Sequence, residues 1–485
     1  MKRSVRLIAN IIFVILLIFI IVVINQILVP KYTIKNSKWP TTTTYNQFYE
    51  MESDSIDVLF LGASVVVNAY NPQELYNKYG IRSYNLGSEQ QSLFLSYYWL
   101  EEALRFQHPK VVVVDTNFLV NIHPESPLNT TEPLVRKCID PMRFSRVKYN
   151  AIHDLCSIDP SQNELSYYLT NIRFHSRWSD LTEQDFILNK QNDLSLKGYG
   201  PLFEYGPDSY ETFFSTDENV TFEFNQLMLE YLDKIVELCR KNNISLILTS
   251  LPGLKMEDGM NNALVSYSKM RGVQYLNFYA DDLYNELGLE LPKESIIEHS
   301  NIWGSIKLTD YLGDILLNEY DVQPARDMQF EESKKDYELI KQEAELTHIE
   351  DAKSYVKDLV NPNWDIFFVV NRDVNILYDA EVKTLFTNLG LNSDMENYPY
   401  YGYLAAIEKG NLLYEQVNYE GSSYKGIVGS EIYKIISNGY NREGYIYIND
   451  NLVSNGKMGL NIVVYSEKEG RVVDSVTLSG ESVIR

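Results

Sequence analysis

The sequence predicts an α/β fold: a parallel β-sheet flanked by helices, with one transmembrane helix before it and a β-rich domain after it. Three observations predict this. Residues 7–29 carry no charge, strand-like apolar runs alternate with amphipathic helical patterns over 55–320, and short strands separated by turn residues begin near 362. Alternating strands and helices are typical of a mostly parallel, helix-covered sheet. The chain, at 485 residues, is long enough for more than one domain.

The apolar segment, residues 7–29, is expected to be a retained membrane anchor. A helix of this length reaches about 30 Å or slightly more, which matches the thickness of a hydrocarbon core. The following "NQILVPKY" contains no small-x-small cleavage site, so a signal peptide is the less suitable interpretation. Because few residues precede the helix, we expect a single-pass protein at the cell membrane with the bulk of the chain outside the cytoplasm.

The expected elements of the sheet region follow from local apolar patterns. The strands are expected at 56–62, 81–86, 110–115, 244–250 and 273–278. The clearest helical patterns cover 92–107, 224–242 and 304–320. Residues 120–223 form a long insertion with weak periodicity, which we interpret as a lid or a wall of a substrate site.

The domain boundaries follow from changes in composition. A charged stretch rich in helix formers separates the sheet region from the β-rich region. We expect an anchor at 1–30, a sheet domain at 31–325, a helical connector at 326–361 and a β-rich domain at 362–485.

Composition excludes several classes of function. Acidic residues outnumber basic ones by 66 to 43, which argues against a nucleic-acid partner and against adsorption to anionic lipid headgroups. The three cysteines are widely spaced without a CxxC pair, so we expect no disulfide framework, and we interpret Cys239 as a small core residue. The six histidines form no HxxxH or HExxH pair. We therefore expect neither a metal nor another cofactor.

The stretch "IDVLFLGASVVVNAYNP" places Ser64 directly after the first expected strand. Open α/β sheets bind their ligands at the carboxyl ends of the strands, so this serine is a candidate nucleophile. The alternative is a structural role, because a serine in this position often caps the next helix.

Three further residues lie where they would assist such a serine. Gly87 follows the second strand, where a glycine lets a backbone N–H approach a reacting atom; an ordinary loop glycine is the alternative. Asn117 follows the third strand and offers an amide N–H to an oxyanion; an Asx turn is the alternative. His299 precedes the last helical pattern and is the histidine best placed to act as a base.

These four stretches together resemble the SGNH (GDSL-type) hydrolase superfamily over residues 55–320. Ser64 matches the nucleophile of the first block, although the usual Gly-Asp-Ser reads Gly-Ala-Ser here. Gly87 and Asn117 match the oxyanion-binding residues of the second and third blocks. His299 matches the base, and its His-x-Asn-x-x-Gly context is similar to the bacterial membrane-anchored branch. The resemblance implies a flavodoxin-like parallel sheet and acyl transfer through an acyl-serine.

One position departs from this pattern. The family usually has an aspartate three residues before the histidine, where this chain has Ile296. Glu294 and Glu298 lie nearby in the sequence. Such an aspartate holds the imidazole in the correct tautomer. Its absence leaves two alternatives: a Ser–His dyad, or an impaired site.

The carboxyl-terminal region has its own resemblance. It is similar to the interleukin-like EMT inducer (PANDER-like) domain. The matching residues are Gly439-Tyr440-Asn441, Gly459-Leu460-Asn461 and Asp474-Ser475. This resemblance implies recognition of a glycan, and a packing or spacer domain is the alternative.

The expected function is that of a serine esterase or O-acyltransferase acting on a cell-surface polysaccharide. The partners would be a glycan or an acyl donor, and a membrane-bound acyltransferase. Within the insertion, His175, Arg177 and Trp178 are candidate substrate-binding residues, because an aromatic face and a guanidinium suit a sugar or an anionic glycan. A core-packed Trp178 and an Arg177 paired with an acid are the alternative. The rival function is a non-catalytic surface protein that binds glycans or proteins on a degenerate scaffold.

Overall fold

The structure is a computed structural model that falls into two compact units, Met1–Tyr337 (unit 1) and Glu338–Arg485 (unit 2). The described residues are 2–30, 43–186, 196–205, 220–252, 256, 259–278, 280–290, 293–296, 299–372, 378–392 and 397–485.

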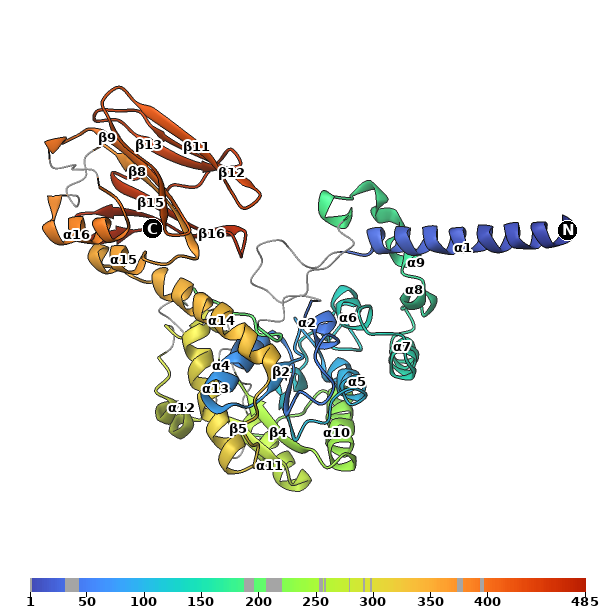
Figure 1. Ribbon diagram of the computed structural model, residues 1–485. Helices are drawn as coiled ribbons and strands as arrows, with labels where there is room; N and C mark the ends of the chain where they lie inside the picture. Colours follow the sequence, from blue (N-terminus) through green and yellow to red (C-terminus); the bar gives the residue numbers. More distant parts are fainter. Residues whose placement is uncertain are drawn as a thin grey trace. The chain divides into compact units, whose positions relative to one another are not determined.

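Unit 1 is built on a five-stranded parallel sheet (Figure 1). Its strands are β1 (Val58–Leu61), β2 (Ser83–Asn85), β3 (Val111–Asp115), β4 (Ser245–Ser250) and β5 (Gln274–Asn277). Their order in the sheet is β2-β1-β3-β4-β5. This is a doubly wound order, and the winding reverses between β1 and β3, where such sheets bind ligands. The predicted parallel sheet is confirmed, and each strand lies within its expected range.

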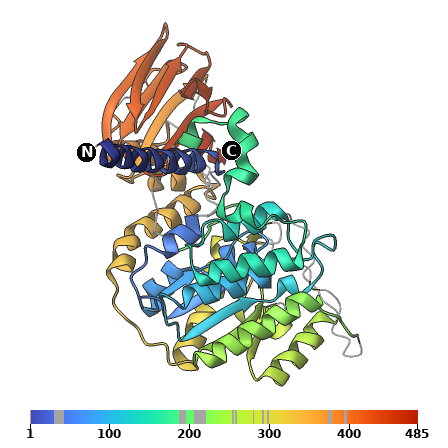
Figure 2. The same cartoon turned by 90° about the vertical axis from the view of Figure 1, so that its right-hand side faces the viewer.

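Helices cover both faces of this sheet (Figures 1 and 2). Leu59 and Leu61 of β1 belong to one core with α5 (Leu93–Ala103), α10 (Gln226–Lys241) and α11 (Met260–Arg271). The intervening Val58 and Phe60 belong to a second core. The helices of that core are α3 (Ser64–Ala69), α4 (Pro72–Tyr79), α12 (Asp281–Leu287) and α13 (Ile302–Asn318). Burial on both faces explains why the strands read as continuous apolar runs.

The insertion is more helical than its weak periodicity predicts. Its α-helices are α6 (Glu132–Ile139), α7 (Arg146–Ile158), α8 (Leu165–Tyr168) and α9 (Asn171–Phe174). Short 3₁₀ helices lie within it at η2 (His175–Ser179) and η3 (Glu183–Phe186), and η1 (Asn117–Leu119) directly precedes it. Most of these elements complete one or two turns, which is too short for a helical repeat to emerge. Two stretches of the insertion, 187–195 and 206–219, lie outside the described residues.

The amino-terminal helix α1 (Lys2–Leu28) is the apolar segment found in the sequence. Its span Arg6–Leu28, with a mean hydropathy of 3.5, is long and apolar enough to cross a membrane. Signal sequences share these properties. Short α2 (Thr43–Phe48) follows, and its Tyr45 stacks on Trp99 of α5 with ring centroids 4.2 Å apart.

Unit 2 contains two antiparallel sheets, as expected for a β-rich region. The larger sheet has the order β10-β9-β8-β15-β16-β17, and the smaller has the order β11-β12-β13-β14. The larger sheet comprises β8 (Trp364–Asn371), β9 (Gly402–Glu408), β10 (Asn411–Asn418), β15 (Gly459–Ser466), β16 (Arg471–Ser479) and β17 (Ser482–Ile484). The smaller comprises β11 (Ser422–Val428), β12 (Glu431–Ser437), β13 (Gly444–Ile448) and β14 (Asn451–Leu452).

Strand β8 shows how the two sheets are held together. Its Ile366 and Phe368 pack in one core with α15 (Ala352–Asp358) and α16 (Ala380–Asn388). The alternate Phe367 and Val369 pack in another core with residues of β12 and β13. This alternation gives three layers, with helices on one face of the larger sheet and the smaller sheet on the other. Helix α14 (Met328–Leu346) contains the boundary between the two units.

Candidate active site

Ser64 lies on a sharp turn from β1 into α3. Gly62 makes the turn possible: a Cβ at this position would lie 2.6 Å from Val66 Cγ2 and 2.9 Å from Asp115 Cβ. The N-cap of α3 is Ala63, and Ser64 is the first residue of the helix. Ser64 therefore does not occupy the capping position that was the alternative interpretation.

His299 is held by a short hairpin at the start of α13. Strands β6 (Ser295–Ile296) and β7 (His299–Ser300) pair, with Ile296 opposite His299. Asn301 caps α13 by accepting a hydrogen bond from Gly304 N–H at 3.2 Å, and its Nδ2 donates to Lys293 O at 2.6 Å. The His-x-Asn-x-x-Gly motif thus has a structural basis: a histidine on the hairpin and the cap of the helix that follows.

The fold brings Ser64 and His299 together across 235 positions of sequence. His299 Nε2 lies 2.8 Å from Ser64 Oγ, and both side chains are half-buried. The helices that carry them are fastened by buried hydroxyls: Ser305 and Thr309 of α13 both donate to Ala69 O of α3, at 3.0 and 3.3 Å. Nε2 accepts the serine proton when Nδ1 carries the imidazole proton. The pair therefore has the geometry of a nucleophile and its general base.

Asn117 supplies an unused donor at the same edge of the sheet. Its side chain is only 8 % exposed, and its Nδ2 has no hydrogen-bond partner among the described residues. The local Asx turn is made by Asp115, whose Oδ2 accepts from Asn117 N–H at 3.1 Å. The amide of Asn117 is thus not used in the turn that was its alternative role. A buried donor without a partner is costly, so it favours a ligand oxygen at this point.

Gly87 is close to Ser64's helix, but its N–H is engaged. It donates to Asn85 Oδ1 at 3.1 Å. The Asn85 amide in turn donates to Val66 O at 2.7 Å and Tyr70 O at 3.0 Å, which fixes its orientation. A Cβ at position 87 would lie 2.9 Å from Val67 Cγ2. Glycine is therefore required here for packing, and the N–H would have to leave or share its present acceptor to bind an oxyanion.

Asp115 is a buried acid at the same edge of the sheet that we did not predict as a site residue. Burial raises its pKa to about 7, although N–H donors from residues 116 and 117 oppose that shift. Its Oδ1 has no hydrogen-bond partner among the described residues. Its position at the end of "VVVVD", beside the serine turn, was the available signal. Near neutral pH this carboxyl exchanges between its neutral and charged forms.

A segment of the insertion, residues 196–205, bridges the serine and histidine helices. Gly200 exchanges two hydrogen bonds with α3: its O accepts from Asn68 Nδ2 at 2.5 Å, and its N–H donates to Val67 O at 2.9 Å. Farther along, Leu202 O accepts from Ile302 N–H of α13 at 2.9 Å. This segment belongs to the stretch expected to form a wall of the site.

The three expected substrate residues of the insertion have other neighbours. His175 Nδ1 lies 3.1 Å from Ile172 O, and Arg177 donates to Leu28 O at 2.7 Å and to Asp185 Oδ1 at 2.9 Å. Trp178 is 74 % exposed, so it is not packed in a core. Within the described part of the chain, their hydrogen bonds do not reach Ser64, His299 or Asn117. Arg177 pairs with an acid, as the structural alternative predicted.

The acid that would orient His299 is not among the nearby described carboxylates. Glu294 pairs with Lys307 at 2.6 Å and accepts from Glu290 N–H at 2.7 Å. Glu298, the other glutamate considered from the sequence, lies outside the described residues. Within the described residues, no group of three or more His, Cys, Asp or Glu side chains forms a candidate metal site.

No protein-family model and no curated protein matches the sequence. Solved structures do match, among them a proposed acylhydrolase from Bacteroides fragilis. The likeness has 12 % identity and a TM-score of 0.28, and it covers 57 % of this chain and 95 % of that chain. A likeness this low carries no information about the activity of this chain.

Proposed function

We propose that this chain is a membrane-anchored, extracytoplasmic serine esterase or O-acyltransferase of the SGNH type that acts on acyl groups of a cell-surface polysaccharide. The observation that carries the proposal is the 2.8 Å contact between Ser64 Oγ and His299 Nε2. The contact joins the end of β1 to the hairpin before α13, at the point where the winding of the sheet reverses. A second observation supports it: the buried Nδ2 of Asn117 has no hydrogen-bond partner among the described residues.

The chemistry follows from these groups. His299 Nε2 takes the proton from Ser64 as its oxygen bonds to the acyl carbon, and the oxyanion formed accepts a hydrogen bond from Asn117 Nδ2. The protonated imidazole then gives its proton to the leaving alcohol as the ester bond breaks. In the second half of the cycle, His299 deprotonates water or a sugar hydroxyl, which attacks the acyl-serine. The imidazolium then returns its proton to Ser64 Oγ as the bond between Ser64 and the acyl carbon breaks, which restores the free enzyme. An esterase and a transferase differ only in the group that attacks the acyl-serine.

Anchoring through α1 would hold the enzyme at the envelope, where acylated polysaccharides are found. The support is the length and composition of Arg6–Leu28. A polysaccharide, an acyl donor and a membrane-bound acyltransferase remain the proposed partners.

Two observations favour a non-catalytic binding protein as the second candidate. The Gly87 N–H is already bonded to Asn85, and Ile296 replaces the expected aspartate. An engaged oxyanion donor and an isoleucine at the position of the family's aspartate are both expected to weaken catalysis.

A fluorophosphonate serine probe separates the two candidates. The expected result is covalent labelling of the wild-type chain that is lost in Ser64→Ala and kept in Ser157→Ala, a control at an exposed serine on α7. Equal labelling of wild type and Ser64→Ala, or no labelling of a folded wild-type chain, would favour the binding protein.

The acceptor is then identified with an acetylated ester as donor. For a transferase, an added polysaccharide should gain acetyl groups in proportion to the ester consumed, whereas an esterase should release free acetate at the same rate with or without the polysaccharide. Loss of both products in Ser64→Ala is required in either case.

A further inference from the structure

Five large apolar side chains of the insertion are exposed between α8 and η3, and α9, η2 and η3 in this segment contact α1. We call them the insertion patch: Leu165, Leu169, Ile172, Trp178 and Phe186. Their exposed fractions range from 40 to 74 %. Exposed apolar side chains are unremarkable when scattered, but several within one short segment indicate an interaction surface.

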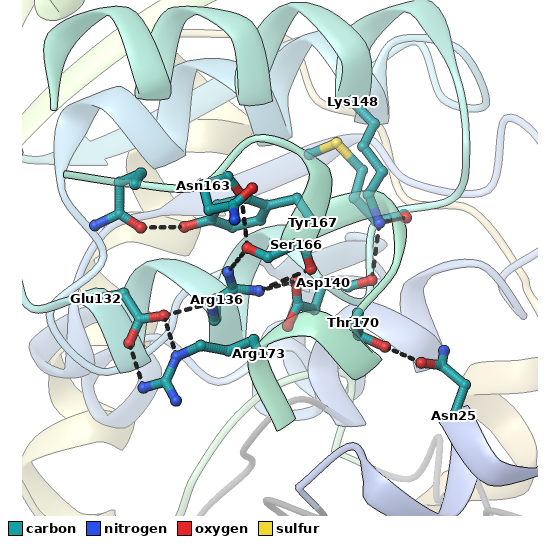
Figure 3. Close-up of polar contacts among 12 residues, drawn as sticks. Asn25, Glu132, Arg136, Asp140, Lys148, Asn163, Ser166, Tyr167, Thr170 and Arg173 are labelled. Atoms are coloured by element: carbon teal, nitrogen blue, oxygen red, sulfur yellow. Dashed lines mark hydrogen bonds and ion pairs between the residues drawn. The ribbon is translucent and has the colours of Figure 1, made fainter. Parts of the chain in front are cut away.

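A buried polar network holds the segment that carries this patch (Figure 3). Arg136 of α6 is 2 % exposed; it donates to Glu132 and to Ser166 of α8, and its guanidinium lies 4.0 Å from the centroid of the Tyr167 ring. Arg173 of α9 donates two hydrogen bonds to the same Glu132 carboxylate, both at 2.9 Å. The polar groups of α8 and α9 are thus used to fasten these helices to α6. The apolar side chains of the patch are left outside this network.

The same segment is bonded to the last turn of α1. Thr170, between α8 and α9, donates to Asn25 Oδ1 (Figure 3), and Arg177 donates to Leu28 O at 2.7 Å. Leu28 is 7 % exposed, in contrast to the exposed residues of the first turns of α1. If Arg6–Leu28 spans the hydrocarbon core, Asn25 and Leu28 lie at its boundary. The patch is then at the level of the membrane interface.

We infer that the insertion patch is a second membrane contact, which lies in the interface of the leaflet where α1 leaves the bilayer. This inference rests on the proposed anchoring by α1. Tryptophan and large apolar side chains partition into the interface, where an amphipathic segment buries its apolar face by about 5–10 Å. We expect the insertion patch to contact the outer ends of the lipid acyl chains and not the charged headgroups. Residues 159–186 contain five acidic residues and two arginines, Arg173 and Arg177, which are both paired with acids.

The contact would fix the orientation of unit 1 on the membrane. Helices α6 and α7 share a core with strand residues Leu59 and Leu61 of the sheet. The patch is therefore joined through α6 to the sheet that carries Ser64. An enzyme docked in this way acts on acyl groups presented close to the membrane surface. The proposed substrate is therefore the part of the polysaccharide that lies near the membrane.

Spin labels on single cysteines of the full chain in phosphatidylcholine vesicles test the inference. Cys156→Ser provides the background, because the other two cysteines are buried. Labels are placed at Leu169→Cys and Trp178→Cys, with Phe19→Cys on α1 and Met270→Cys, an equally exposed apolar position on α11, as controls. Accessibility is measured to oxygen, which concentrates in the bilayer, and to a water-soluble nickel complex.

We expect the labels at 169 and 178 to be more accessible to oxygen than to the nickel complex. Their depth in the bilayer should be smaller than that of the label at 19. The label at 270 should be exposed to water. A label at 19 in the bilayer with labels at 169 and 178 in water would overturn the inference and leave the anchor intact. A label at 19 in water would overturn both. Labels at 169 and 178 shielded from both reagents would indicate a protein contact and also overturn it.

Lipid charge provides a second readout. Because the contact is apolar, the depth of the labels at 169 and 178 should be unchanged when phosphatidylglycerol is added to the vesicles. Membrane contact that appears only with the anionic lipid would contradict the inference.

Discussion

The hydroxyl of Ser64 becomes a nucleophile only if a base removes its proton at the moment of attack, and His299 Nε2 is placed to do this. The oxyanion that results must be met by donors that are already in position. Here the two candidate donors differ. Asn117 Nδ2 has no hydrogen-bond partner in the part of the chain that the structure describes, whereas Gly87 N–H donates to Asn85 Oδ1. Asn117 is therefore expected to carry the larger share of the stabilisation.

Asn117→Ala should lower kcat by about 10²–10³-fold with little change in KM. The melting temperature should stay nearly constant, because Nδ2 bonds to no described residue of the folded protein. Ester hydrolysis and thermal unfolding measured on the same samples check this. Asn68→Ala is the matched control: its buried amide donates to Gly200 O, so its loss should reduce stability by about 1–3 kcal/mol. A destabilised Asn117→Ala with unchanged kcat would mean that Asn117 only supports the loop.

Asp115 should make stability depend on pH. Burial raises its pKa from 3.8 to about 7, so the folded protein holds this proton more tightly than the unfolded chain does. Its stabilising contribution is complete below pH 3.8 and is lost as the pH rises through about 7. Asp115→Asn keeps an acceptor for Asn117 N–H but has no charge to bury. The melting temperature of Asp115→Asn minus that of wild type should therefore be larger at pH 8 than at pH 5. The same difference in melting temperature at pH 5 and pH 8 would show that the carboxyl is already ionised at pH 5.

At the scale of elements, helix α13 and its hairpin position His299. Gly304 lies so close to the hairpin that an added Cβ would be 2.3 Å from Glu294 O. This backbone atom belongs to the residue that precedes β6. The close approach is the reason that the hairpin and the helix keep a fixed relation.

Gly304→Ala should therefore displace the hairpin and lower kcat by at least about 10²-fold, because a misplaced base costs this much. Gly313→Ala is the matched control in the same helix. Its added Cβ would meet the Tyr79 ring at 2.4 Å, away from the hairpin, so stability should fall without a specific loss of kcat. Kinetics and thermal unfolding of both variants separate the two effects. Equal losses of kcat at equal destabilisation would contradict the positioning role of Gly304.

The strands and the order of the candidate site residues could be predicted from the sequence because both depend on local sequence patterns. Buried strands read as apolar runs, and Ser64 and Asn117 follow two of them directly. The engagement of Gly87 was not predictable, since it depends on how the Asn85 side chain is held by carbonyls of α3 and of the turn after it. Similarly, the hydrogen bond from Arg177 to Leu28 O was not predictable, because the two residues lie 149 positions apart in the sequence. The salt bridge from Arg177 to Asp185 fits the alternative that the sequence also allowed.

At the scale of the whole molecule, each unit has cores of its own. The cores of unit 2 centre on β8 and its neighbours, and Ile462 of β15 is fully buried there. Ile462→Ala should lower the free energy of unfolding of unit 2 by about 2–5 kcal/mol. In differential scanning calorimetry one transition should shift to lower temperature, while fluorophosphonate labelling of Ser64 is unchanged below that transition. Loss of labelling in step with unfolding of unit 2 would show that the units fold as one.

Acyl transfer at this site requires that Ser64 be able to form a covalent acyl ester. The most direct test of this requirement is to mix the full chain with an activated acetyl ester, quench with acid, and locate the adduct by peptide mass spectrometry. We expect one acetyl group on the peptide that contains Ser64. It should form rapidly in wild type, at least about 10²-fold more slowly in His299→Gln, and not at all in Ser64→Ala. An unmodified Ser64, or acetylation at the same rate in His299→Gln, would contradict the proposal.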